Sequence, residues 1–119
     1  MALANLDLLE AGILDHARKV APYFQERLKS LEDLPLVGEV RGLGLMACVE
    51  CVADRESRNP LKLDYEVGKR IDAHCHALGL LVRPLIHMCV MSPPLVITRD
   101  QIDDMVDILR RGIELTMDA

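Results

Sequence analysis

The chain has 119 residues, a formal net charge of −5 and 50% hydrophobic residues, with one Phe, two Tyr and no Trp. This length suits a single domain over residues 1–119 with an aliphatic core. The acidic balance without clustered Lys and Arg excludes nucleic acid as an expected partner, and no apolar run reaches the ~18 residues that would cross a membrane. Four Cys and no signal peptide predict reduced thiols and a cytoplasmic location.

Residues 1–31 are expected to form a helical segment, because apolar residues recur there at helical spacing. Gly12 is expected to divide it into a short helix and a longer one. Pro22 either kinks the longer helix or begins a new turn. Met1 leads directly into helix-like sequence without an N-cap residue, which suggests that the chain begins inside an element.

An α+β core is expected over residues 37–119. The second half of Val37–Val52 predicts a strand whose one face carries Leu43, Leu45, Ala47, Val49 and Cys51. The opposite positions are also mostly apolar, so we expect this strand to be central and covered on both faces. Gly42 and Gly44 permit a bend before it.

The next segments are a charged loop over residues 53–60 and a helix that Asp64 caps and Gly79 ends. The buried face of this helix is expected to hold Val67, Ile71, Cys75 and Leu78. Two short strands follow, Leu80–Arg83 and His87–Met91, and Pro84 limits the pairing of the first.

The last helix has the clearest start signal in the chain. Thr98 and Gln101 form a capping box, and Ile97 with Ile102 forms a hydrophobic staple. Arg110 and Arg111 suit its C-terminal end. Its predicted buried stripe is Ile102, Met105, Val106, Leu109 and Ile113. The predicted fold is therefore α+β, a small mostly antiparallel sheet with helices packed on one face.

Arg83 is the leading candidate for a binding residue. Its guanidinium keeps its charge and lies among Leu, Val and Met residues, which suits bidentate recognition of a carboxylate. On the chemistry alone, an arginine at a strand end whose charge reaches solvent is the more common case.

Three other patterns suggest chemistry but fail on geometry. Cys48 and Cys51 are spaced C-x-x-C within a strand, where they point to opposite faces. His74 and His76 lie about 200° apart around a helix and cannot share a metal ion. The glycines of Arg41–Gly44 precede a strand and not a helix N-terminus, so they do not predict a phosphate site. No catalytic residue and no metal ligand is predicted.

Four segments together resemble the C-terminal part of class III aminotransferases, in particular the omega-amino acid:pyruvate branch. They are Val40–Met46, Gly79–Arg83, Ser92–Thr98 and Ile102–Asp103. Residues 2–10 also resemble the family's long helix after the catalytic lysine region. These are fold-type I enzymes that use pyridoxal phosphate (PLP), and the resemblance covers nearly the whole chain.

The resemblance implies a role for three residues. Arg83 matches the arginine that binds the carboxylate of the amino or keto acid in several members, and Ser92 and Pro93 match a segment that walls the active-site entrance. The implied reaction transfers an amino group between an amine or omega-amino acid and a keto acid such as pyruvate.

The family's large PLP-binding domain, which carries the Schiff-base lysine, has no counterpart here, and Lys19, Lys29, Lys62 and Lys69 match no such context. We therefore expect a C-terminal small domain that binds no PLP and is inactive alone. Its partners would be the missing large domain and, given the high apolar content, further copies of itself in a homo-oligomer. The alternative is a free-standing α+β module that binds a small carboxylate through Arg83 without catalysis.

Overall fold

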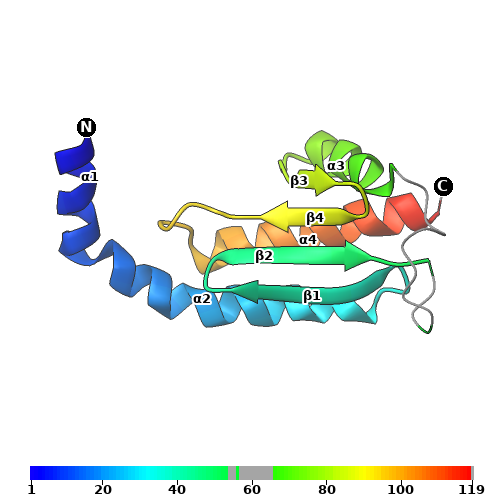
Figure 1. Cartoon of the computed structure of the whole chain (residues 1–119), viewed down its shortest axis with the longest axis horizontal. Coiled ribbons are helices and arrows are strands. Elements are labelled where there is room, and N and C mark those ends of the chain that lie inside the picture. Colours follow the sequence, from blue (N-terminus) through cyan, green and yellow to red (C-terminus); the bar gives the residue numbers. More distant parts are fainter. Residues whose placement is uncertain (54–55, 57–65, 119) are drawn as a thin grey trace.

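The fold is an antiparallel sheet with helices packed against one side (Figure 1). The computed structural model describes residues 1–53, 56 and 66–118, so Asp64 and nearly all of the predicted charged loop lie outside the described residues. In chain order the elements are α1 (Ala2–Leu8), α2 (Leu14–Lys29), β1 (Val37–Leu43), β2 (Met46–Cys51), α3 (Val67–Ala77), β3 (Arg83–Leu85), β4 (Met88–Met91) and α4 (Arg99–Met117).

The first two helices meet at a kink, as predicted. Gly12 has a φ of 120°, which side-chain-bearing residues rarely adopt, so the helical path breaks there. Helix α2 continues through Pro22, which therefore does not begin a new turn. Helix α1 buries no residue and projects away from the sheet (Figure 1). No helix in the described ranges is both long and apolar enough to cross a membrane.

The sheet has the strand order β1-β2-β4-β3 with every neighbouring pair antiparallel. Strand β2 is central, as predicted. The sequence prediction missed β1, because its glycines and charged residues interrupt the apolar alternation that identifies a strand. The predicted bend at Gly44 is the two-residue turn between β1 and β2, where Gly44 has a φ of 61°.

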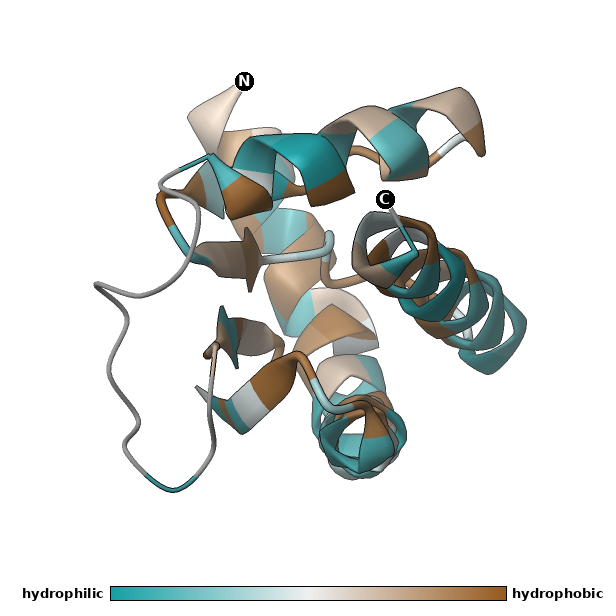
Figure 2. Ribbon diagram, turned by 90° about the vertical axis from the view of Figure 1, so that its right-hand side faces the viewer, coloured by the Kyte–Doolittle hydropathy of each residue, from teal (hydrophilic) through white to brown (hydrophobic). Residues whose placement is uncertain are grey.

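Only one face of β2 is covered by described elements. Ala47, Val49 and Cys51 of β2 are buried on the helix side. On the other face, Met46 of β2 is 62% exposed, and its register partner on β1, Leu43, is 79% exposed. The prediction that both faces are covered was therefore wrong, and so was the placement of Leu43 on the buried face. An apolar composition on both faces does not reveal which of them the chain's own helices cover. Figure 2 shows the helices gathered to one side of the strands.

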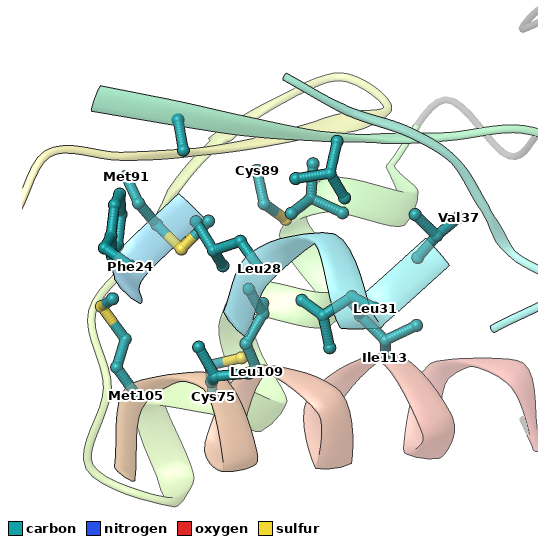
Figure 3. Close-up of a cluster of buried hydrophobic side chains, with 14 of the residues drawn as sticks. Phe24, Leu28, Leu31, Val37, Cys75, Cys89, Met91, Met105, Leu109 and Ile113 are labelled. Atoms are coloured by element: carbon teal, nitrogen blue, oxygen red, sulfur yellow. The ribbon is translucent and has the colours of Figure 1, made fainter. Parts of the chain in front are cut away.

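The core lies between the sheet and helices α2 and α4. Figure 3 shows Phe24 and Leu28 of α2 beside Met91 of β4, with Leu109 of α4 below them. Side chains of β1, β2 and β4 and of α2, α3 and α4 join the same cluster. Its fully buried larger members are Phe24, Leu28, Leu31, Val37, Val40, Val49, Ile71, Ile102, Val106, Leu109 and Ile113.

Helix α3 ends as predicted at Gly79, whose φ is 97°. The Leu80 amide donates to the carbonyl of Cys75 at 2.9 Å and closes this cap. Leu78 is 45% exposed, so it lies outside the buried face predicted for this helix. Strand β3 begins at Arg83, three residues later than predicted, and it tolerates Pro84 because it is an edge strand.

Helix α4 confirms most of its predicted features. Thr98 and Gln101 form the capping box, and Ile97, Ile102 and the predicted stripe are buried. The helix runs to Met117, so neither Arg110 nor Arg111 lies in its last turn, contrary to the prediction. Arg110 instead donates to Asp33 at 3.0 Å and to the Ser30 carbonyl at 2.9 Å, which ties α4 to the end of α2.

Candidate functional site

Strands β3 and β4, the connection over residues 92–97 and the start of α4 surround a pocket of about 540 Å³. The three site residues predicted from the sequence all line it, although they come from two separate segments of the chain. The lining residues are Leu80, Leu81, Val82, Arg83, Val90, Met91, Ser92, Pro93, Pro94, Ile97, Gln101 and Met105.

Arg83 is the first residue of β3 and pairs in register with Val90 of β4. Within the described residues its guanidinium makes no hydrogen bond and no ion pair, whereas Arg27 and Arg41 each bind carboxylates. The described lining of the pocket contains no Asp or Glu. The positive charge of Arg83 is therefore available to an acidic ligand.

One wall of the pocket is the segment that connects β4 to α4. Ser92 and Pro93 follow β4 directly, and Ile97 is buried next to the N-cap of α4. The Ile97 amide donates to the Pro94 carbonyl at 3.1 Å, which closes a turn. The Ile97 carbonyl accepts from the Nε2 atom of His16, on α2, at 2.7 Å.

Several lining residues were not predicted as site residues. Gln101 and Met105 were identified only as a cap and a core residue of α4, and Leu80 to Val82 as a strand. His16, which contacts the pocket wall from outside the lining, had no sequence signal either, because its hydrogen-bond partner, the Ile97 carbonyl, lies 81 positions away. Contacts of this kind depend on the packing of α2 and α4 against the same sheet.

The walls of the pocket are mostly apolar and carry a few polar groups. Mostly apolar walls with a guanidinium, a hydroxyl and an amide suit a small carboxylate with a short apolar chain. The described lining has no His, Lys, Cys or acid, so it supplies neither a general base nor an activated nucleophile.

The cysteines lie outside this pocket and are protonated thiols at neutral pH. Burial raises the pKa of Cys51 to about 12 and that of Cys75 to about 11, and it raises the pKa of Cys89 as well. Cys51 is buried in the core, while Cys48 is half-buried on the opposite face of β2. The described residues contain no group of His, Cys, Asp or Glu that could hold a metal ion.

The pocket residues do not fit PLP. The cofactor is held by a lysine and by polar groups around its ring and phosphate, and no lysine is among the described lining residues. Lys29 of α2 and Lys69 of α3 form exposed ion pairs with Glu32 and Glu66, and Lys62 lies outside the described residues.

Residues 1–113 match the family model described as Aminotransferase class-III. The putrescine–pyruvate aminotransferase of Pseudomonas aeruginosa is 37% identical over 121 residues, which cover 100% of this chain and 26% of that protein. A probable mitochondrial gamma-aminobutyrate transaminase 3 of Oryza sativa is 36% identical over 97 residues, which cover 82% of this chain and 19% of that protein. The chain thus spans about a quarter or less of the length of these relatives.

Solved transaminase structures have the same fold over the matched part. A transaminase with L-alanine superposes with a TM-score of 0.91 at 36% identity, covering 98% of this chain and 28% of the other. The form of the Vibrio fluvialis aminotransferase that is bound to the PLP derivative PMP gives a TM-score of 0.85 at 37% identity, covering 91% of this chain and 24% of the other. The chain therefore belongs to the class III aminotransferases, a family of fold-type I enzymes whose cofactor is PLP.

Proposed function

We propose that this chain is the C-terminal small domain of a PLP-dependent aminotransferase and binds the substrate carboxylate through Arg83. The enzyme would transfer an amino group between an amine or omega-amino acid and a keto acid such as pyruvate. The observation that carries the proposal is the guanidinium of Arg83 in a mostly apolar pocket whose described lining has no acidic residue.

The pocket suits the half-reaction in which a keto acid or an amino acid is the substrate. A keto acid or amino acid presents a carboxylate, which a guanidinium binds through two parallel hydrogen bonds. The apolar walls, with Ser92 and Pro93 on one side, would enclose the short carbon chain. Two relatives bear names that fit, one with pyruvate and one with gamma-aminobutyrate, each a small carboxylate.

The electron-sink chemistry of PLP would come from a large domain with its own lysine. We accordingly propose that the 119-residue chain alone holds no PLP covalently and has no transaminase activity. An absorbance band of bound PLP that survives dialysis and disappears on borohydride treatment would contradict this. Its partners would be the large domain and further copies in a homo-oligomer.

The function is tested in a chimeric enzyme that carries this chain in place of the matching region of a relative. This chain replaces the matched region of the P. aeruginosa putrescine–pyruvate aminotransferase, with which it aligns over its whole length. A hydrogen bond to a charged group contributes about 1.5–3 kcal/mol, so Arg83→Ala should lower kcat/KM for pyruvate roughly 10- to 150-fold. Arg83→Lys should recover only part, because an ammonium keeps the charge but not the bidentate geometry.

The matched control is Arg18→Ala, which removes the same charge from an exposed pair with Asp15 outside the pocket. It should leave kcat/KM unchanged, and Arg83→Ala should leave the half-reaction of an amine without a carboxylate nearly unchanged. Equal losses for the amine and for pyruvate would mean that Arg83 supports the fold. Pyruvate binding to the isolated chain without any activity in the exchanged enzyme would favour the free-standing carboxylate-binding module.

A further inference from the structure

The pocket wall over residues 92–97 buries few of its apolar side chains. Leu95 and Val96 at its tip are 38% and 58% exposed, and Ile97 is the residue of this segment that enters the core, at 6% exposure. Exposed apolar side chains contribute little to holding a connection in place. The position of this wall relative to Arg83 therefore depends on the burial of Ile97 and on the hydrogen bonds of the segment.

One of these hydrogen bonds comes from a distant helix. The Nε2 atom of His16 lies 2.7 Å from the carbonyl oxygen of Ile97, in a partly buried contact between residues 81 positions apart. A carbonyl oxygen only accepts, so Nε2 carries a proton and donates. The neutral ring protonated at Nε2 and the imidazolium can both make this bond.

Both ends of this bond are anchored. His16 lies one turn before Val20 on α2, and Val20 and Phe24 fix that helix in the core at 4% and 0% exposure. On the other side, the Ile97 amide closes the turn to Pro94, and Thr98 begins the capping box of α4. The imidazole therefore joins α2 to the C-terminal end of the wall, directly before the N-cap of α4.

We infer that His16 is a positioning residue of the Arg83 pocket. By holding the Ile97 carbonyl, it fixes the wall from Pro93 to Ile97 at one distance from Arg83, so that a carboxylate bound there has its carbon chain enclosed. The expected effect of His16 on carboxylate binding rests on the function proposed for Arg83. The expected effect of His16 on the position of the wall is independent of that function.

Two variants of His16 separate the donor from the bulk of the side chain. His16→Gln keeps an N–H donor near the position of Nε2, and His16→Leu keeps a similar volume without a donor. Amide hydrogen exchange of Ile97 in the 119-residue chain reports the stability of the wall. Amides of Val49 in β2 and Leu109 in α4 report the stability of the whole fold.

A net hydrogen bond of about 0.5–1.5 kcal/mol predicts that His16→Leu speeds Ile97 exchange, relative to the two core amides, by roughly 2- to 12-fold. His16→Gln should recover most of the protection. The inference is overturned if Ile97 exchange is unchanged relative to the core in His16→Leu. Equal acceleration in both variants would overturn it as well, because the loss would then be one of shape and not of the donor.

A pyruvate titration of the same samples and of Arg83→Ala, followed at the backbone amides of Ser92 and Gln101 in the pocket lining, tests the consequence for binding. His16→Leu should weaken pyruvate binding by a similar factor and His16→Gln should restore it. If the unmodified chain and Arg83→Ala respond to pyruvate alike, the proposed function of Arg83 fails in this chain, while Ile97 exchange still decides the role of His16. If pyruvate binds through Arg83 equally well in all His16 variants, the positioning role is refuted.

Discussion

Arg83 and Val90 are register partners across the β3–β4 hairpin, and Val90 lines both the Arg83 pocket and a shallow groove of about 370 Å³ along β2. The groove also contains the exposed side chains of Leu43 and Met46. The candidate carboxylate site thus shares Val90 with the groove. A structure that covers the groove and extends to Arg83 would remove water from around the guanidinium and strengthen its ionic hydrogen bonds.

Gly112 of α4 packs closely against α3. A Cβ atom at this position would lie 2.6 Å from the Sγ atom of Cys75 and 3.4 Å from the Ile71 carbonyl oxygen. Gly→Ala within a helix normally stabilises by up to about 1 kcal/mol, but overpacking costs about 1–3 kcal/mol. We expect Gly112→Ala to be destabilising in urea unfolding measurements.

A substitution of Cys75 tests whether a steric clash causes this loss of stability. Cys75→Ala removes the sulfur that a Cβ at position 112 would meet, so Gly112→Ala should cost much less in that background. Additive losses in the double variant would show that the two positions do not interact, and the steric explanation would be wrong.

Ile86 is a strained residue in the turn between β3 and β4. Its φ is 57°, which is costly for a β-branched side chain, because the left-handed region costs about 1–2 kcal/mol for residues with a Cβ. Ile86→Gly should therefore melt above Ile86→Ala, because both variants lose the isoleucine side chain and only glycine relieves the strained φ, which outweighs its entropy cost of about 0.5–1 kcal/mol. Ile86→Ala keeps the strain and loses apolar contact, so it should melt lower than the unmodified chain. The reverse order of the two variants would contradict the assignment of strain.

Glu50 lies on the open face of the sheet between Arg41 and His87. Hydrogen bonding from Arg41, and then from His87 at 3.0 Å, lowers the pKa of Glu50 below its ordinary value of about 4.3. A lowered folded-state pKa stabilises the fold above the unfolded value, and this stabilisation is lost as the pH falls through the folded one.

The pKa shift has two measurable consequences. Glu50→Gln should make unfolding less pH-dependent below about pH 4.3. In carboxyl NMR titrations, Arg41→Met should raise the midpoint of Glu50 more than His87→Phe does. An unshifted midpoint in the unmodified chain would show that these contacts are not kept in solution.

Helix α1 is expected to promote self-association. It buries no residue, and Leu3 and Leu6, which lie on one side of the helix, are 77% and 53% exposed. In sedimentation velocity, the chain should form dimers or larger species at high concentration, and Leu3→Gln with Leu6→Gln should reduce them. Asp7→Asn on the same helix is the control. A monomer at all concentrations would count against the homo-oligomer.

Sequence patterns determined the elements whose signals are local. The capping box of Thr98 and Gln101, the break at Gly12 and the helix end at Gly79 each depend on residues within a few positions, and all three are present. The resemblance that pointed to the family was likewise read from short segments. Such features form wherever the local backbone preference is strong.

Only the tertiary structure decided which faces are covered and which segments meet. Leu43 and Ala47 look equally apolar in the sequence, but the hairpin at Gly44 leaves one exposed and turns the other toward the helices. The His16–Ile97 hydrogen bond joins residues 81 positions apart, and the pocket brings Arg83 to Gln101. These contacts follow from burial of the core between α2, α4 and the sheet. Sequence periodicity identifies the apolar face of an element, but it does not identify the element that packs against that face, because the hydrophobic effect is not directional.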